Sequence, residues 1–92
     1  MTTKYRITKT THYARQTETS RQLTLSQAVK YYAKTLERGV YWSTRSKGGT
    51  QINTTPETID GLIESLNAAS ANSNLDRVGD TFTYEECVRS LA

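Results

Sequence analysis

Apolar residues recur with helical spacing over residues 24–39. Within TLSQAVKYYAKTLERG they follow the i, i+3, i+4, i+7 pattern of one helix face. These positions are Leu25, Ala28, Val29, Tyr32, Ala33 and Leu36. Thr24 and Gln27 have the spacing of a capping box, in which the pair satisfies free backbone amides of the first turn. Glycine commonly follows a helix end, so we predict a helix that stops at Gly39.

Residues 4–14 alternate between two sets of side chains, which is typical of a half-exposed strand. One set begins apolar and is expected to pack on the helix: Tyr5, Ile7, Lys9, Thr11 and Tyr13. The other set is polar and cationic: Lys4, Arg6, Thr8, Thr10, His12 and Ala14. Residues 15–23 have no helical stripe and form either a loop or a return strand whose Leu23 enters the core. We favour the return strand over part of this segment.

Residues 40–54 are predicted to form a hairpin. VYWSTRS is strand-like, with Val40, Trp42 and Thr44 on one face and Tyr41, Ser43 and Arg45 on the other. Lys47-Gly48-Gly49 is the turn, because glycine adopts positive φ without steric cost. Residues 50–54 then return as a short strand, with Ile52 pointing inward.

Two further helices are predicted in the second half of the chain. Thr55-Pro56-Glu57 combines a preferred cap, a proline suited to the first helical position and a carboxylate at the positive end of the helix dipole. The buried stripe of this helix is Ile59, Leu62, Ile63, Leu66 and Ala69, and its end is expected to fray over residues 68–74. Thr83 and Glu86 form a second candidate capping box. The final short helix would turn Tyr84, Cys87, Val88 and Leu91 inward.

The predicted order of elements is β(β)αββαα, in a single domain over residues 1–92. This is an α+β fold: a small antiparallel sheet of three or four strands with helices packed on one face. The sequence shows no secretory segment and no apolar run near the roughly 18 residues of a membrane span. The single cysteine, Cys87, has no partner for an internal disulfide. We therefore expect a cytoplasmic protein, without membrane contact and monomeric.

Charge is divided unequally between the two halves of the chain. Residues 1–50 hold ten Lys or Arg and two acidic residues, a net +8, whereas residues 51–92 hold two Arg and seven acidic residues, a net −5. This asymmetry indicates one surface for a polyanion and another for a basic partner. Ordinary solubility charge is the alternative explanation.

The candidate chemistry does not favour an enzyme. His12 is the only histidine, and no group of Cys, His, Asp or Glu has the spacing of a zinc site. A nucleophilic pair of Cys87 with His12 is conceivable, but a thiol on the apolar stripe of a helix is more often simply packed. We expect no catalytic residue, no metal, no cofactor and no small-molecule substrate.

Binding to nucleic acid fits the residues better. If the strands pair as predicted, the sheet face away from the helices displays Lys4, Arg6, Tyr41 and Arg45, and His12 joins them if the first strand stays regular along its length. Cations next to an exposed aromatic ring are typical of single-stranded nucleic-acid surfaces, although Tyr and Arg on a sheet can also merely cover each other. The helix carries a second cationic element, Lys30, Lys34 and Arg38, which is equally typical of a solvated helix face. Lys47 in the predicted turn completes the candidate set.

The chain as a whole resembles the small phage-encoded anti-CRISPR proteins that inhibit the type I-F surveillance complex. The resemblance extends from TTKYRITKTTHYARQTE through LTLSQAVKYYAKTLERGVYW to TFTYEECVRSLA. It implies an inhibitor that docks on the Cas protein backbone, with possible contact to the guide RNA, and interferes with pairing between guide and target DNA. These inhibitors share no motif, so the resemblance implies no individual site residue.

Two other functions are consistent with the residues. One is a general module that binds single-stranded nucleic acid, for which affinity would fall steeply with salt. The other is a regulatory protein that contacts no nucleic acid and binds its partner through the acidic second half. Glu57, Asp60, Glu64, Asp76, Asp80, Glu85 and Glu86 make up that acidic set.

Overall fold

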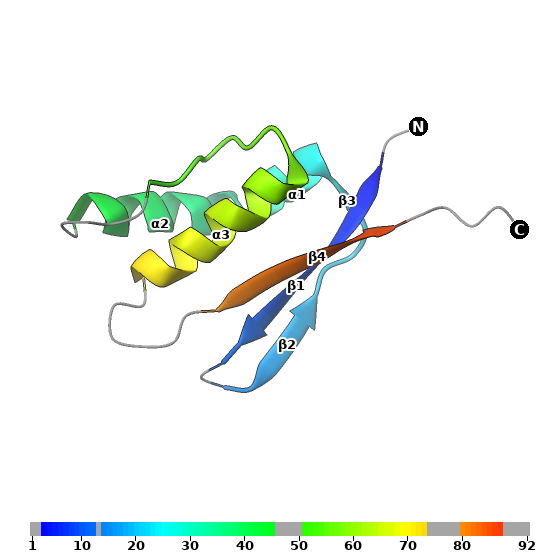
Figure 1. Ribbon diagram of the computed structural model, residues 1–92, viewed down its shortest axis with the longest axis horizontal. Coiled ribbons are helices and arrows are strands. Elements are labelled where there is room, and N and C mark those ends of the chain that lie inside the picture. Colours follow the sequence, from blue (N-terminus) through cyan, green and yellow to red (C-terminus); the bar gives the residue numbers. More distant parts are fainter. Residues whose placement is uncertain (1–2, 13, 46–50, 74–79, 88–92) are drawn as a thin grey trace, which may run out of the picture.

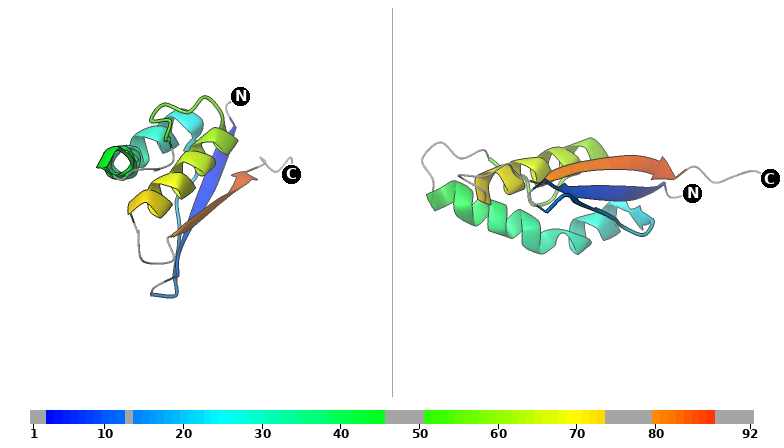
Figure 2. Two further views of the ribbon diagram at one scale, coloured as in Figure 1. Left: turned by 60° about the vertical axis from the view of Figure 1, so that its left-hand side comes forward. Right: turned by 90° about the horizontal axis from the view of Figure 1, so that it is seen from below.

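Helices pack on one face of an antiparallel sheet in the computed structural model, which describes residues 3–12, 14–45, 51–73 and 80–87 (Figure 1). These residues form four strands and three helices, so the predicted α+β class is confirmed. The order is β1 (Lys4–Thr11), β2 (Gln16–Thr19), β3 (Leu23–Thr24), α1 (Leu25–Tyr31), α2 (Ala33–Arg45), α3 (Ile59–Ser73) and β4 (Thr81–Cys87). Figure 2 shows the helices on one side of the strands.

Strand β1 is the centre of the sheet. Along one edge it pairs antiparallel with β4, from Lys4 opposite Cys87 to Thr10 opposite Thr81. The other edge is shared by β2, which pairs with residues 8–11, and β3, which pairs with residues 4–5. Between these two short strands, Ser20 completes the edge: its backbone N–H donates to the Ile7 carbonyl at 2.9 Å, and its Oγ accepts from the Ile7 N–H at 3.0 Å.

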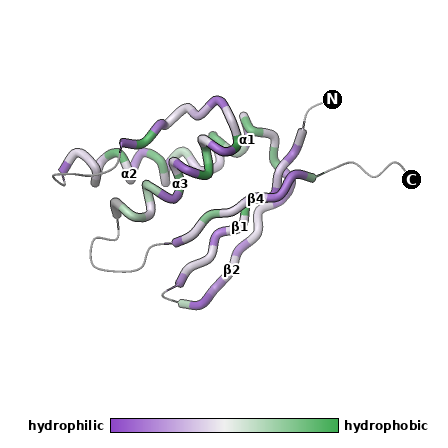
Figure 3. Tube along the Cα trace, in the orientation of Figure 1, coloured by the Kyte–Doolittle hydropathy of each residue, from purple (hydrophilic) through white to green (hydrophobic). Residues whose placement is uncertain are grey.

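The first part of the chain agrees with the prediction from its sequence. The alternating segment forms β1, which ends at Thr11 rather than at residue 14. The return strand appears as β2, and Leu23 is fully buried. Ile7 is also fully buried, as expected for the set that faces the helices. All four residues of β2 are exposed, and Figure 3 shows this strand as polar along most of its length.

The predicted capping box begins α1. The Gln27 N–H donates to the Thr24 hydroxyl at 3.2 Å, and the Thr24 N–H donates to the Gln27 side-chain carbonyl at 3.0 Å. Both amides would otherwise have no partner at the start of the helix. The local sequence signal therefore sets this helix start.

Every layer of the fold contributes to the core. β1, β3 and β4 provide Ile7, Leu23 and Phe82. The helices, the junction between α1 and α2 and the segment before α3 provide Ala28, Tyr32, Leu36, Ile52, Leu62, Leu66 and Ala69. The Tyr32 and Phe82 rings meet edge to face, with centroids 5.8 Å apart. Burial raises the pKa of Tyr32 to about 12, because the interior disfavours the tyrosinate.

The predicted hairpin over residues 40–54 is wrong, because the helix continues to Arg45. Tyr32 separates α1 from α2, yet helical hydrogen bonding spans it: its N–H donates to the Ala28 carbonyl and its carbonyl accepts from Leu36 N–H, both at 3.0 Å. Residues 51–54 form no strand, although Ile52 is buried as predicted. The Lys47-Gly48-Gly49 turn lies outside the described residues.

Gly39 is a contact point between helices rather than a helix end. A Cβ placed on Gly39 would lie 2.6 Å from the Ala69 Cα and 2.6 Å from the Ile52 Cδ1, and closer still to the Ala69 Cβ. Only a residue without a side chain lets α2 approach α3 this closely. Tertiary packing thus overrides both the end signal of glycine and the strand propensity of the residues after it.

Helix α3 begins and ends later than its sequence predicts. The cap is Thr58, whose hydroxyl accepts from the Gly61 N–H at 3.0 Å, whereas the Thr55 N–H bonds the Asn53 side chain. The inward stripe is confirmed, with Leu62, Leu66 and Ala69 buried and Ile59 and Ile63 packed at its margin. Residues 68–73, where fraying was expected, belong to α3, and residue 74 lies outside the described part of the chain.

The predicted final helix is also wrong, because residues 81–87 form β4. Thr83 and Glu86 have the capping-box spacing, but the same segment alternates with period two, and β1 offers it a full-length partner. Phe82 is buried and Tyr84 is 37% exposed, so the inward set differs from the predicted one. Val88 and Leu91 lie beyond the described residues. The element order is therefore βββαααβ in place of β(β)αββαα.

Replacing Gly39 with alanine tests the contact between α2 and α3. At an open helix position this change stabilises by about 1 kcal/mol. Here we expect a net loss of about 1–3 kcal/mol, because the new methyl group overlaps Ala69 and Ile52. Urea unfolding followed by circular dichroism measures the change.

Gly61→Ala is the matched control. Its Cβ would meet only the Thr58 hydroxyl at 3.1 Å and the Pro56 Cβ at 3.7 Å, so we expect little loss of stability. Equal unfolding midpoints for the Gly39→Ala and Gly61→Ala proteins would contradict the close approach.

Candidate nucleic-acid interface

The continuous run of α1 and α2 presents a line of cations. Lys30, Lys34, Arg38 and Arg45 are all exposed, and with about 3.6 residues per turn they fall within about a quarter of the helix circumference, together with Tyr41. We name these five residues the cationic stripe. The sequence predicts the first three as a helix stripe, and the extension of α2 adds Tyr41 and Arg45.

Tyr41 and Arg45 form a pair within the cationic stripe. The Arg45 Nη1 donates to the Tyr41 hydroxyl at 2.9 Å, and the Arg45 Cζ lies 5.4 Å from the centre of the Tyr41 ring. The spacing is i, i+4, so the two side chains lie on the same helix face. Tyr41 is 51% exposed, and this pair therefore holds a ring and a guanidinium side by side at the surface.

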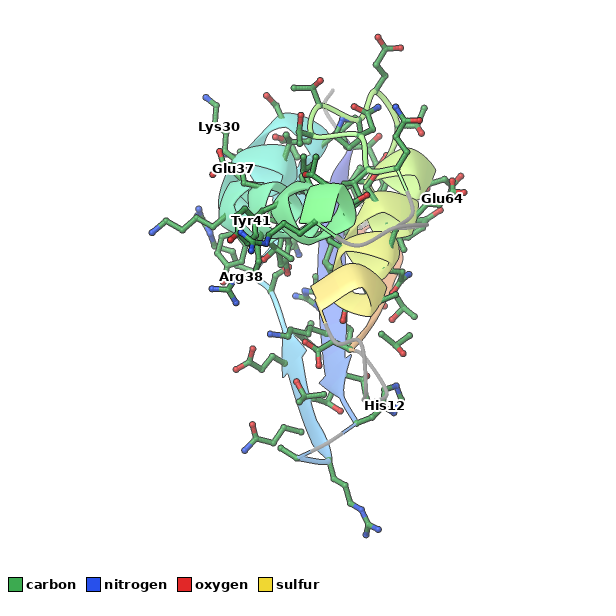
Figure 4. The ribbon with its side chains drawn as sticks, turned by 90° about the vertical axis from the view of Figure 1, so that its left-hand side faces the viewer. His12, Lys30, Glu37, Arg38, Tyr41 and Glu64 are labelled. Carbon is green, nitrogen blue, oxygen red and sulfur yellow. The ribbon has the colours of Figure 1, made fainter. Side chains whose placement is uncertain are left out.

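The surroundings of the cationic stripe are mostly favourable to an anion. Figure 4 shows Lys30, Arg38 and Tyr41 on one side of the molecule, with Glu37 among them. Four cations to one carboxylate leave the line positive. Tyr31, 60% exposed, adds a second ring next to Lys30 in the sequence. A line of cations with exposed rings can meet phosphates and stack on bases.

The open sheet face, turned away from the helices, differs from the prediction. Tyr41 and Arg45 do not join it, because they belong to α2. Lys4 and Arg6 do lie on it, and the Arg6 Nη1 is 3.9 Å from the Glu85 carboxylate on β4. His12 lies just past the end of β1, with Nε2 2.7 Å from the Thr81 hydroxyl. Lys47 falls outside the described residues.

Threonine dominates the middle of this open sheet face. Two rows cross β2, β1 and β4: Thr19, Thr8 and Thr83, then Thr17, Thr10 and Thr81. The hydroxyls of Thr8 and Thr19 are 3.3 Å apart. Cross-strand threonine pairs stabilise an exposed sheet face. Among its described residues this face holds no Tyr, Trp or Phe, so it offers no ring for stacking beyond the His12 imidazole.

The acidic residues of α3 and β4 lie apart from the cationic stripe. Asp60 and Glu64 are exposed on α3, and Glu85 and Glu86 are exposed on β4. In Figure 4, Glu64 is on the opposite side of the molecule from Lys30 and Arg38. The charge asymmetry of the sequence thus becomes a separation in space.

Cys87 and His12 lie at opposite ends of the sheet. Cys87 is half-buried opposite Lys4, whereas His12 bonds Thr81, which pairs with Thr10. Six residues along β1 separate the two positions, or about 20 Å. The pair cannot act together as nucleophile and base. Cys87 is also a strand residue, not the helix residue that was predicted.

Two other features of the described chain bear on the site. Among residues 3–12, 14–45, 51–73 and 80–87, no three His, Cys, Asp or Glu side chains gather as a metal site would require. None of the helices in these ranges is long and apolar enough to cross a membrane.

Comparison with protein-family models, curated proteins and solved structures finds no match to this chain.

Chromatography on immobilised heparin, a polyanion, tests which Lys and Arg side chains form the main contact with an anionic partner. We compare Lys34→Gln with Arg38→Gln, on the cationic stripe, and Lys4→Gln with Arg6→Gln, on the open sheet face. Both double variants lose two positive charges. We expect the first to elute at lower salt, because Arg6 already faces Glu85 whereas the stripe cations reinforce one another.

Because the net charge is matched, any difference in elution reports the position of the cations. Equal elution of the two variants, or earlier elution of the Lys4 and Arg6 variant, would contradict the assignment to the cationic stripe.

Proposed function

We propose that this protein inhibits the type I-F CRISPR surveillance complex by docking on its Cas subunits and guide RNA and blocking target DNA. The observation that carries the proposal is the separation of two oppositely charged surfaces on one small domain. A guide-RNA complex presents a matching surface for each: the phosphates of its RNA for the cations, and the Lys and Arg residues that hold target DNA for the carboxylates. The resemblance of the chain to anti-CRISPR proteins supports the same function.

The cationic stripe is the side suited to RNA. From Lys30 to Arg45 the helix run extends about 22 Å, at about 1.5 Å per residue. Such a line can follow several successive phosphates, and the Tyr41–Arg45 pair can stack on an unpaired base. Contacts to the guide backbone would leave less room for a target strand to pair with it.

The acidic side is suited to the DNA-binding groove. Asp60, Glu64, Glu85 and Glu86 are exposed on α3 and β4, where they can meet basic residues that otherwise bind phosphate. Carboxylates that occupy such a groove compete with DNA for the same cations. Inhibition then needs no catalytic residue, because the domain acts by occupying the site.

An electrophoretic assay with purified type I-F complex tests this function. The protein is added before the labelled target duplex, and we expect loss of target binding. Lys34→Glu with Arg38→Glu should raise the concentration for half-inhibition by about tenfold or more, since two attractive contacts become repulsive. Lys4→Glu with Arg6→Glu is the control with the same charge change, and we expect a much smaller effect.

Two results would contradict the proposal at different levels. Unchanged target binding with the wild-type protein would reject the inhibitor. Full inhibition by the folded Lys34→Glu, Arg38→Glu protein would retain the inhibitor and reject the cationic stripe as its RNA contact.

The alternative function is a module that binds single-stranded nucleic acid. The exposed Tyr31 and Tyr41 next to the stripe cations favour it, since free strands are captured by stacking and phosphate contacts together. Fluorescence anisotropy with a labelled single-stranded RNA separates the two functions. The module requires affinity that falls steeply with salt, and absent or salt-independent binding would reject it.

A further inference from the structure

Strand β4 forms an outer edge of the sheet, and its two sides differ in how many of their backbone groups are hydrogen-bonded. One side of β4 pairs with β1 over its whole length. On the other side, the Asn67 side chain holds Phe82: its Nδ2 donates to the Phe82 carbonyl at 3.1 Å, and its Oδ1 accepts from the Phe82 N–H at 2.7 Å. An amide that both donates and accepts in this way occupies the place of one residue of a neighbouring strand.

The same edge is open two residues further on. Backbone groups of alternate residues in a strand point to the same side, so the N–H and C=O of Tyr84 and Glu86 point outward like those of Phe82. Among the described residues, no hydrogen bond reaches these outward groups. The last part of β4 therefore keeps the donors and acceptors that an added strand would use.

Carboxylates surround this open edge. The Tyr84 hydroxyl donates to Asp60 Oδ1 at 2.8 Å, and this hydrogen bond raises the pKa of Tyr84. Asp60, Glu64 and Asn67 have the i, i+4, i+7 spacing of one helix face, and the first and last both contact β4. Glu64 therefore lies on the α3 face toward this edge. Glu86 shares the sheet face turned to the helices, opposite Tyr5, and Glu85 lies on the open sheet face.

The distribution of charge identifies the occupant. Side chains of an added strand alternate between the two sheet faces, and each face carries carboxylates at this edge. A second copy of the chain would bring its own Glu85 and Glu86 against them, which is unfavourable. A basic strand would meet opposite charge on both faces.

We propose that the outer edge of β4 at Tyr84 and Glu86 binds an extended, lysine- or arginine-rich segment of a partner protein by strand addition. Backbone hydrogen bonds hold the segment, and Asp60, Glu64, Glu85 and Glu86 select its charge. Asn67 fixes where the added strand ends, because it already occupies the edge at Phe82. This surface is distinct from the cationic stripe and includes the carboxylates of the acidic side proposed above for the Cas groove. The strand addition itself is argued from the backbone of β4 and is tested without a Cas protein.

Nuclear magnetic resonance titration of the labelled full chain with a capped peptide of alternating lysine and valine tests the proposal. We expect saturable binding, with slowed hydrogen exchange at the Tyr84 and Glu86 amides. A peptide of alternating glutamate and valine is the charge control and should not bind. A third peptide carries an N-methyl group on every residue and should bind at least about tenfold more weakly, since neither of its edges keeps the donors that strand addition needs.

Two substitutions at Glu86 distinguish the contribution of its backbone N–H to binding from the contribution of its side-chain charge. Glu86→Gln removes the carboxylate and should weaken binding by about threefold, as expected for one exposed ion pair. Glu86→Pro also removes the outward N–H, without loss of a hydrogen bond to β1, and should weaken binding at least about tenfold beyond Glu86→Gln. The amide spectrum around Ile7 and Phe82 reports whether the proline variant is folded. The methylated peptide tests, on the unaltered protein, whether backbone hydrogen bonds hold the added strand.

Several results would overturn the proposal. These are equal binding of the lysine and glutamate peptides, equal binding of the methylated and unmethylated peptides, and unchanged exchange at Tyr84 and Glu86 in the saturated complex. Dimerisation of the free protein through this edge, detected by sedimentation, would assign the edge to a second copy instead. None of these results bears on inhibition of the CRISPR complex, because no Cas protein or RNA is present.

Discussion

The close approach of α2 and α3 at Gly39 and Ala69 is the constraint on which the rest of the structure depends. It leaves no space for a Cβ on Gly39, and the Ile52 side chain closes the same contact from the segment before α3. With the helices this close, Leu36 and Leu66 are fully buried above the sheet, as is Ile7 on β1. A chain of 92 residues buries a small core, and its free energy of unfolding is correspondingly small. Separation of the two helices would therefore remove a large part of that stability.

The same contact determines where the charges lie. Because α2 does not end at Gly39, Tyr41 and Arg45 extend the line begun by Lys30 and are removed from the sheet face. The sheet face is left with threonine hydroxyls and an Arg6–Glu85 pair, whereas the helix run keeps an almost undiluted positive charge. The acidic residues of α3 and β4 then lie apart from it. A domain with two such surfaces can contact two components of a nucleoprotein at once.

The sequence predicts those parts of the fold that depend on neighbouring residues. The Thr24–Gln27 capping box, the alternation of β1, buried Leu23 and the inward stripe of α3 all follow from local spacing. Gly39 and the Thr83–Glu86 pair were misread because their signals are ambiguous without the tertiary partner. Glycine permits a helix end and a close contact alike, and only the position of Ala69 decides between them. Residues 81–87 become a strand because β1, seventy residues earlier in the chain, offers a free edge.

For the site, the spacing of Lys30, Lys34, Arg38, Tyr41 and Arg45 was visible in the sequence, but it becomes one stripe only if the helix continues.

The most direct test of this account is the backbone conformation of residues 40–45 in solution, measured from Cα chemical shifts together with the nuclear Overhauser effect between Gly39 and Ala69. Helical shifts are expected throughout Val40–Arg45, with a strong contact between the Gly39 Hα and the Ala69 methyl group. Strand-type shifts over these residues, with no such contact, would return Tyr41 and Arg45 to a sheet and contradict both the packing and the cationic stripe.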